Sequence, residues 1–244
     1  MSPSPFQQQF FAQMSHPHWG DELFDEVADT VYFVKDLSGR YVAVNETLVR
    51  RCGAASKKDL IGKTAAEVFP APLGEDYTRQ DLALIQGEPD ITNRLELHLY
   101  PGGESGWCLT WKKALRGQSG DVIGLSGISR DVNSTPDDVE SLEGLSKVLS
   151  HIRDHLDEPL TLGDLERATR LSAFQIKQRI KRLFGISPRQ YIMRSRIESA
   201  RHQLTYTNLP LSEIALACGF GDQSSFTRQF KRSVGITPKA YRDQ

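Results

Sequence analysis

The chain has 244 residues, of which 39% are apolar and 25% are charged, and its formal net charge is −1. This composition is typical of soluble globular proteins, and the length suits two domains that each bury a core. No apolar run approaches the roughly 18 residues that span a bilayer, so we predict no membrane contact. The first 20 residues lack a basic start followed by an apolar stretch. We therefore expect no signal peptide and a cytoplasmic protein.

The distribution of charge and the cysteine content indicate which kinds of partner and site the chain can have. Residues 151–244 hold 16 Lys and Arg against 9 Asp and Glu, a balance of +7, whereas residues 1–150 hold 14 against 22, a balance of −8. This division indicates that only the carboxy-terminal part meets a polyanion. The three cysteines, Cys52, Cys108 and Cys218, are scattered and form no CxxC motif. That argues against a disulfide framework and a cysteine zinc site.

Residues 1–21 are expected to be a flexible segment, and residues 22–134 to form the first domain. Residues 30–45 read as two β-rich runs around a turn at Ser38-Gly39, after which Asn45 caps a short helix. Further short helices follow, one of them from about 73 to 86. Three strands are expected around 91–99, 106–115 and 121–130.

This order of elements resembles a PAS domain, and so do two motifs, Asp36-x-x-Gly39-Arg40-Tyr41-x-x-x-Asn45 and Ile128-Ser129-Arg130-Asp131-Val132. The resemblance implies an α+β fold with a five-stranded antiparallel sheet, short helices and a sensor role. The Asn-Cys-Arg-Phe-Leu motif of flavin-binding members is absent, and residues 73–86 hold no histidine for haem. We therefore predict no cofactor.

A PAS domain can enclose a small molecule or only its own side chains. Two polar residues, Asn45 and Arg94, are candidate anchors for such a ligand. The apolar and aromatic candidates for the pocket lining are Tyr32, Val34, Leu48, Phe69, Tyr77, Leu84, Leu97, Leu109 and Trp111. Core packing is the alternative role for each of them, and a PAS domain used only for dimerisation or protein docking stays open.

Residues 135–158 are predicted to be a linker followed by a transmission helix. Asn133–Asp138 is polar, and Leu142, Leu145, Leu149, Ile152 and Leu156 then repeat at intervals of 3, 4, 3 and 4 residues. This stripe is either a short dimer seam or a face that packs on the next helices. His151 and His155 lie one helical turn apart, but no third ligand is nearby, so we predict no metal site.

The most informative feature is an internal repeat. Residues 171–191 read LSAFQIKQRIKRLFGISPRQY and recur 50 positions later, at residues 221–241, as GDQSSFTRQFKRSVGITPKAY. A fixed period means that one supersecondary unit is built twice. We predict two helix-turn-helix units, at about 161–184 and 211–234, joined by a connector helix at 188–206. They form an all-α domain over residues 140–244.

Apolar residues at helical spacing mark the core sides of these helices. They are Leu162, Leu165, Ala168, Ile176, Ile180 and Leu183 in the first unit and Leu211, Ile214, Ala217, Phe226, Phe230 and Val234 in the second. Small Ala168 and Ala217 are expected where two helices approach closely. Gly185 and Gly235 are expected to end the second helix of each unit.

Removing the core positions leaves two outward faces. They carry Ala173, Phe174, Lys177, Gln178 and Lys181 in the first unit and Gln223, Ser224, Ser225, Thr227, Arg228 and Lys231 in the second. Arg and Lys bind guanine edges, Gln binds adenine, and aromatic or methyl groups contact the thymine methyl. We predict that these eleven residues contact double-stranded DNA. An ordinary solvated face is the alternative for either helix alone.

Residues 140–242 resemble the DNA-binding domain of AraC/XylS-family regulators, most closely in LSEIALACGFGDQSSFTRQFKR at 211–232 and GITPKAYR at 235–242. The resemblance implies seven helices that read asymmetric sites in two major grooves, usually in an activator that contacts RNA polymerase. The family's base-contacting positions fall on Phe174, Lys177, Gln178, Ser224 and Arg228. The first unit departs from the pattern at two positions, Ile180 and Arg170.

Together these features predict a one-component transcriptional regulator that is not an enzyme. Its expected partners are operator DNA and RNA polymerase, with a small-molecule effector and a second copy of the chain left open. An alternative is an enzyme fused to this domain, as in alkyl-transfer DNA-repair adaptors. That function needs reactive cysteines before residue 140, and Cys52 and Cys108 have no ligand-like neighbours.

Overall fold

The computed structural model describes residues 13, 20–99, 105–132 and 139–243. The chain divides into two compact units, Met1–Ser134 and Thr135–Gln244. Most of the segment expected to be flexible, and the linker at 133–138, lie outside the described residues. Among the residues that are described, no helix combines the length and apolarity that crossing a membrane needs.

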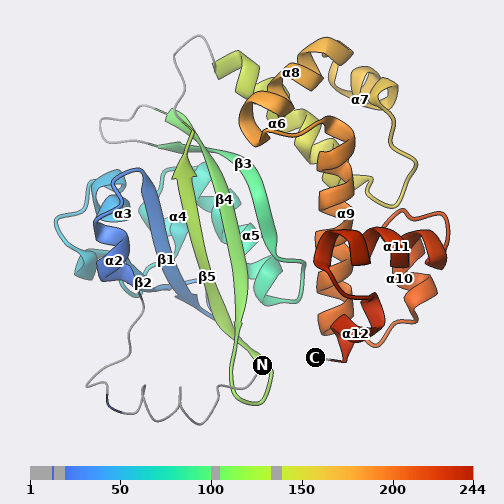
Figure 1. Ribbon diagram of the computed structural model, residues 1–244. Coiled ribbons are helices and arrows are strands. Elements are labelled where there is room, and N and C mark those ends of the chain that lie inside the picture. Colours follow the sequence, from blue (N-terminus) through green and yellow to red (C-terminus); the bar gives the residue numbers. More distant parts are fainter. Residues whose placement is uncertain (1–12, 14–19, 100–104, 133–138, 244) are drawn as a thin grey trace. The chain divides into compact units, whose positions relative to one another are not determined.

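The first unit is a five-stranded antiparallel sheet with short helices, which confirms the predicted α+β fold. The strand order is β2-β1-β5-β4-β3, and α4 and α5 lie behind the sheet in Figure 1. The strands are β1 Thr30–Asp36, β2 Tyr41–Val44, β3 Ile91–Leu99, β4 Ser105–Arg116 and β5 Val122–Asp131. The helices are α2 Asp21–Asp25, α3 Glu46–Arg51, η1 Lys57–Asp59, α4 Ala65–Val68 and α5 Leu73–Ile85.

Alternation along β1 decides which side chains enter the core. Val31 and Phe33 point to the face that packs on the helices, and so does Lys35, which pairs with Asp81 of α5. Tyr32 and Val34 therefore point to the opposite face, because successive strand residues alternate. The helix-side core also contains Tyr41, Val44, Leu48, Val49, Leu60, Ala65, Phe69, Tyr77, Leu84 and Leu125.

Three charged residues occupy the middle of this core. Asp81 accepts hydrogen bonds from Lys35 and from Lys112, the latter at 2.7 Å between Nζ and Oδ1, and all three side chains are at most 4% exposed. The Lys35 ammonium also lies 4.2 Å from the centre of the Tyr41 ring. Burial alone would raise the pKa of Asp81, but Lys112 and Lys35 together lower it. The carboxylate is thus the shared counter-charge of two buried ammonium groups.

A second polar cluster lies between α3 and the strands. Arg51 forms an ion pair with Asp131, and its Nη1 lies 3.3 Å from both His98 Nδ1 and Cys108 Sγ. Burial, Arg51 and Lys112 lower the pKa of His98 to about 3. A neutral imidazole can accept a hydrogen bond from Arg51, whereas a protonated one cannot.

The second unit is all helical, as predicted. Its helices are α6 Val139–Asp154, α7 Leu162–Thr169, α8 Ala173–Phe184, α9 Pro188–Tyr206, α10 Leu211–Ala217, α11 Gln223–Val234 and α12 Pro238–Arg242. The side chains of Thr161 and Ser172 cap the starts of α7 and α8. Gly185 and Gly235 follow α8 and α11 with φ of 72° and 93°.

The leucine stripe of α6 packs inside this unit. Leu142, Leu145, Leu149 and Ile152 are buried, as is Val148 between them, and α6 contacts α7 and α8. These contacts favour the packing role of the stripe. Dimerisation through the start of α6 stays a prediction.

The prediction that two alanines mark a close helix approach is wrong. Ala168 and Ala217 are both exposed. In α10 the buried side contains Ile214 and Ala215 instead. The packed side of α10 therefore keeps Ile214 and continues through Ala215 to Cys218 instead of to Ala217.

Replacing the shared counter-ion should destabilise the first unit. Asp81→Asn keeps the side-chain size but leaves two buried ammonium groups without a negative charge, which we expect to cost about 3–5 kcal/mol. Urea unfolding of the full chain, followed by Trp107 and Trp111 fluorescence, measures this cost. Asp76→Asn is the matched control on α5, because its partner Arg79 is 74% exposed. Equal midpoints for the two variants would contradict the assignment.

The lowered pKa of His98 predicts a pH-dependent stability. An unfolded histidine titrates near about 6.5, so neutral His98 stabilises the fold above that pH, and this contribution is lost as the pH falls toward about 3. Between pH 7 and pH 5 the first unit should lose roughly 2 kcal/mol. We expect His98→Gln to flatten this dependence and His151→Gln, in the other unit, to keep it. Unfolding curves at the two pH values test this, and a wild-type slope in His98→Gln would refute it.

Candidate DNA interface

The first candidate reading helix, α8, is held at both ends by local hydrogen bonds. The Ser172 N–H donates to Gln175 Oε1 at 2.9 Å, and the Gln175 N–H donates back to Ser172 Oγ at 3.3 Å. This reciprocal pair satisfies two amide groups that a helix start leaves without partners. The start of α8 is therefore defined by its own sequence.

The two sides of α8 differ as predicted for a reading helix. Ile176 and Ile180 are fully buried. On the opposite side Phe174 is 71% exposed, which is unusual for a large aromatic residue. Among the other residues predicted to contact DNA, Ala173 is half-buried and three are exposed: Lys177, Gln178 and Lys181.

The second candidate reading helix, α11, repeats this design. Asp222 accepts a hydrogen bond from the Ser225 N–H at 2.7 Å, and Phe226 and Phe230 are fully buried. Thr227 donates its hydroxyl proton to the Gln223 carbonyl at 2.8 Å, so the helix already uses that donor. On the outward side Ser225 and Thr227 are half-buried, and the exposed residues are Gln223, Ser224, Arg228 and Lys231.

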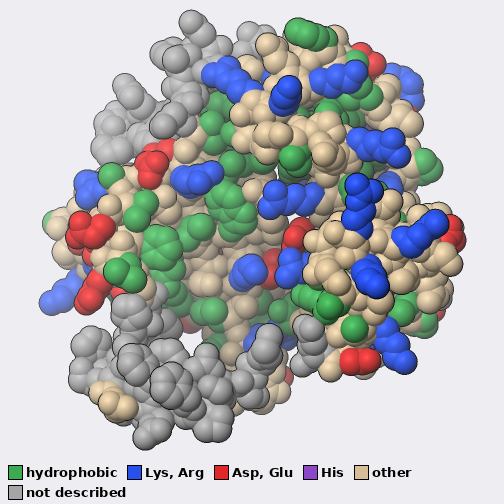
Figure 2. All heavy atoms as spheres, in the orientation of Figure 1, with side chains coloured by type: hydrophobic (Ala, Val, Ile, Leu, Met, Phe, Trp, Pro, Cys, Tyr) green, Lys and Arg blue, Asp and Glu red, His purple; other side chains and the backbone are tan. Residues whose placement is uncertain are grey.

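Positive charge on these outward faces is not neutralised locally. Within the described part of the chain, no ion pair is found for Lys177, Lys181, Arg228 or Lys231. Figure 2 shows further Lys and Arg side chains over the helices of the second unit. Uncompensated cations beside amide and hydroxyl groups suit a phosphate backbone with base edges next to it.

Helix α9 connects the two helix-turn-helix units and packs into the core of each. At its start Ser187 and Gln190 repeat the reciprocal cap, with the Ser187 N–H 2.9 Å from Gln190 Oε1. Tyr191 packs on Phe184 of α8, with 4.8 Å between the ring centres. Farther along, three residues enter the core formed with α10 and α11: Ile197, Ala200 and Leu204.

An arginine that no sequence pattern singled out joins the middle of α9 to the segment after α6. Arg196 Nε donates to the Leu156 carbonyl at 3.0 Å, and its Nη2 donates to the Glu158 carbonyl. Gly219 fits against the same Leu156 carbonyl: its φ is 72°, and a Cβ there would lie 2.1 Å from Leu156 O. The turn between α10 and α11 thus requires glycine for backbone shape and for space.

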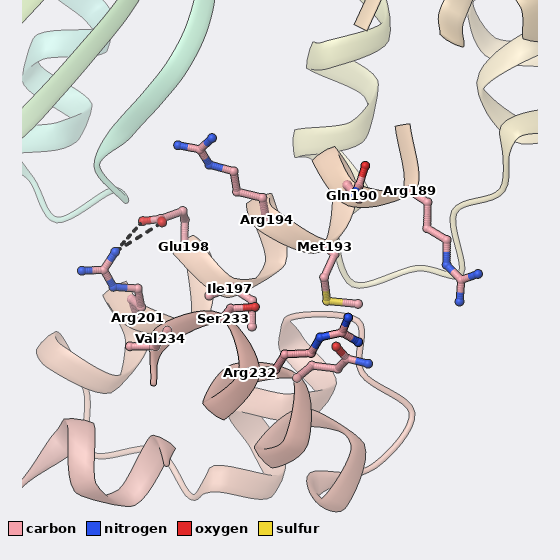
Figure 3. Close-up of a pocket in the computed structure, with 11 residues that line it drawn as sticks. Arg189, Gln190, Met193, Arg194, Ile197, Glu198, Arg201, Arg232, Ser233 and Val234 are labelled. Carbon is pink, nitrogen blue, oxygen red and sulfur yellow. Dashed lines mark hydrogen bonds and ion pairs between the residues drawn. The ribbon is translucent and has the colours of Figure 1, made fainter. Parts of the chain in front are cut away.

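Two grooves flank α9. The first, of about 800 Å³, lies between α9 and α11 and is lined by four arginines, Arg189, Arg194, Arg201 and Arg232. In Figure 3 Glu198 pairs with Arg201, with 3.3 Å from each carboxylate oxygen to Nη1. Met193 and Ile197 give this groove an apolar floor.

The predicted ligand-pocket residues do not line a single cavity. Phe69 and Tyr77 meet on the helix side, with 5.4 Å between ring centres. Arg94 points to that side too, with Nε 3.0 Å from Glu96 Oε1, and Leu48 and Leu84 belong to the helix-side core. Strand alternation and register place the others on the opposite face: Tyr32, Val34, Leu97, Leu109 and Trp111.

Asn45 is a structural cap and not a free polar anchor. Its Nδ2 donates to the carbonyls of Phe24 and Thr30 at 2.9 and 2.8 Å. Its Oδ1 accepts from the Tyr32 and Leu48 amides at 2.9 and 3.3 Å. All of its hydrogen-bonding capacity is therefore used within the fold.

Metal-binding and nucleophilic groups are poorly placed in the described residues. No group of three or more His, Cys, Asp or Glu side chains is arranged there to hold a metal ion. Burial raises the pKa of the Cys52 and Cys108 thiols to about 12. A thiol with so high a pKa is almost entirely protonated near neutral pH and is a poor nucleophile.

Comparisons with known proteins agree with this geometry. A helix-turn-helix domain model matches residues 165–244, and a PAS fold model matches residues 24–135. The probable transcriptional regulator LumQ of Photobacterium leiognathi is 34% identical over 106 residues, which cover 43% of each chain. The transcriptional activator RhaS of Enterobacter sp. (strain 638) is 31% identical over 108 residues, 43% of this chain and 39% of RhaS.

A crystal structure of an AraC-type regulator from Chromobacterium violaceum is 28% identical, covers 43% of this chain and 94% of that chain, and gives a TM-score of 0.41. The match spans less than half the length of LumQ and of RhaS, two of the curated relatives. Its carboxy-terminal part is thus similar to helix-turn-helix transcriptional regulators, and residues 24–135 ahead of it are similar to the PAS fold.

Proposed function

We propose that this chain binds duplex DNA sequence-specifically through α8 and α11 and thereby regulates transcription. The observation that carries the proposal is the shared design of the two helices. Each has a side-chain cap at its start, a fully buried apolar side and an outward side of cations and hydrogen-bonding groups. A solvated face explains either helix alone, but it does not explain two matched faces on two helices that one connecting helix joins.

The length of α9 suits two successive contacts on DNA. Its 19 residues span about 28 Å at 1.5 Å per residue. One turn of B-DNA is about 34 Å long. Because α9 is packed into both helix-turn-helix cores, α8 and α11 would enter neighbouring segments of the major groove on one side of the duplex.

Several outward side chains have a chemical role in this interpretation. Arg228 presents the planar guanidinium that bonds guanine O6 and N7, and Gln178 and Gln223 offer the amide that matches adenine. Phe174 is suited to contact a thymine methyl. The lysines supply charge toward phosphate, so binding should weaken steeply with salt.

We infer that the PAS unit controls this activity from the amino-terminal side of α6. Helix α6 packs on α7 and α8, so any displacement of α6 changes the support of the first reading helix. Activation of transcription through RNA polymerase, in the cytoplasm, is the corresponding output, and RhaS carries the description of an activator. A PAS unit that only docks a partner or dimerises is the alternative. Native mass spectrometry separates the two by a retained small molecule or its absence.

A catalytic function receives less support. A repair enzyme built on this output domain needs an accessible thiolate in the amino-terminal unit. Cys108 is fully buried and Cys52 half-buried, and burial raises the pKa of both. One buried acid of the same unit, Asp81, forms ion pairs with two lysines.

The reading role of Arg228 gives a direct prediction. Arg228→Ala should weaken binding to the specific site by about 1–3 kcal/mol and relax the preference at one base pair. Selection of binding sites from random DNA, followed by titration of the selected duplex, measures both effects. Arg232→Ala is the matched control, because Arg232 lies one turn further along α11 and lines the groove beside α9. If both variants keep the same affinity and base preference as the parent, Arg228 does not read DNA.

A further inference from the structure

A second groove, of about 770 Å³, is built into the first helix-turn-helix unit. It is bounded by the start of α7, the flank of α8, the turn after α8 and the start of α9. Every lining residue lies between Leu160 and Arg196, so the second of the two compact units of the chain forms the whole groove. Its volume is within the range of about 300–1,000 Å³ that small-molecule sites occupy.

The floor of this groove is apolar. Leu165 and Ile192 are buried, and three further apolar side chains remain partly open to the groove: Leu162, Ile186 and Met193. Binding a bare phosphate or chloride ion on an apolar floor yields no favourable free energy from the floor. Binding a hydrocarbon or aromatic body that displaces water from the floor does yield it.

The rim of the same groove is cationic. Lys177 and Lys181 reach it from α8 and Arg189 and Arg196 from α9, and none of the described residues that line it carries a carboxylate. Arg196 is tied to the Leu156 carbonyl, whereas Lys177, Lys181 and Arg189 are exposed at the rim. A neutral apolar ligand would cover these cations without supplying a counter-charge, which is unfavourable.

We propose that this groove binds a small amphipathic anion, an aromatic or aliphatic body with one carboxylate or sulfonate group. The body lies on Leu162, Ile186 and Met193, and the anionic group lies between Lys181 and Arg189. A guanidinium binds such a group through two parallel N–H bonds.

The ligand also competes with DNA, a consequence that rests on the function proposed above. Lys177 and Lys181 line the groove and belong to the outward face of α8 that is predicted to contact DNA. A ligand that engages these ammonium groups removes positive charge from the DNA side. Ligand and DNA must then weaken each other by the same factor.

The test uses a fluorescent probe of this chemistry and its uncharged counterpart. Anilinonaphthalene sulfonate brightens in apolar surroundings, and phenylnaphthylamine has the same rings without the sulfonate. Each is titrated into the full chain without DNA, into Arg189→Gln and Ile186→Asn, and into the control Arg194→Gln. Arg194 is also an exposed arginine of α9, but it lines only the other groove. Thermal unfolding by circular dichroism verifies that each variant folds.

We expect saturable binding of the sulfonate that Arg189→Gln weakens about tenfold or more, the loss of one charged hydrogen bond. Arg194→Gln should bind as the parent does, and the neutral probe should bind more weakly. Equal affinity in Arg189→Gln and Arg194→Gln, equal affinity of the two probes, or no saturable binding would each overturn the site.

Competition is measured separately, with the probe bound and a selected DNA duplex added. Release of the probe by DNA supports competition, and joint binding of both contradicts it. Because the probe titrations contain no DNA, failure of the groove leaves the DNA-binding proposal standing. Likewise, a chain that binds the probe but no DNA would refute only the proposed function.

Discussion

Both helix-turn-helix units depend on α9. Tyr191 packs this helix against α8, while Ile197, Ala200 and Leu204 fix it in the core with α10 and α11. A single continuous helix shared by the two cores has no flexible joint, so the separation of α8 and α11 is set by helix geometry. Arg196 adds a second constraint, because it ties the middle of α9 to the segment that follows α6.

The PAS unit buries charged side chains as well as apolar ones. Its core holds Lys35, Asp81 and Lys112 where other cores hold hydrocarbon, and Arg51, Asp131 and the neutral His98 form a second polar cluster. Removing one member of such a cluster destabilises the fold by more than the intact cluster stabilises it. These clusters make the stability of this unit sensitive to any change of charge in its interior.

Sequence patterns predict this molecule well wherever the controlling interactions are local. Gly185 and Gly235 end their own helices as expected, and the 50-residue repeat alone indicates two equivalent helical units. The charged core is not predictable in the same way, because Lys35 and Asp81 are 46 residues apart and Arg51 and Asp131 are 80 apart. Alternation shows that neighbouring strand residues face opposite sides, but not which side the helices cover. Because of that ambiguity, strand residues such as Tyr32, Val34, Leu109 and Trp111 are easily assigned to one pocket with Phe69 and Tyr77, although they lie on the other face of the sheet.

The central claim is that α9 holds α8 and α11 at a fixed separation on DNA. The most direct measurement is the affinity of the chain for its selected site after insertion of about five or about ten base pairs, half a turn or a full turn, between the two contacted segments. A rigid α9 predicts that both insertions reduce binding to the non-specific level. If the full-turn insertion keeps the original affinity, the connection between the reading helices is flexible and the claim is wrong.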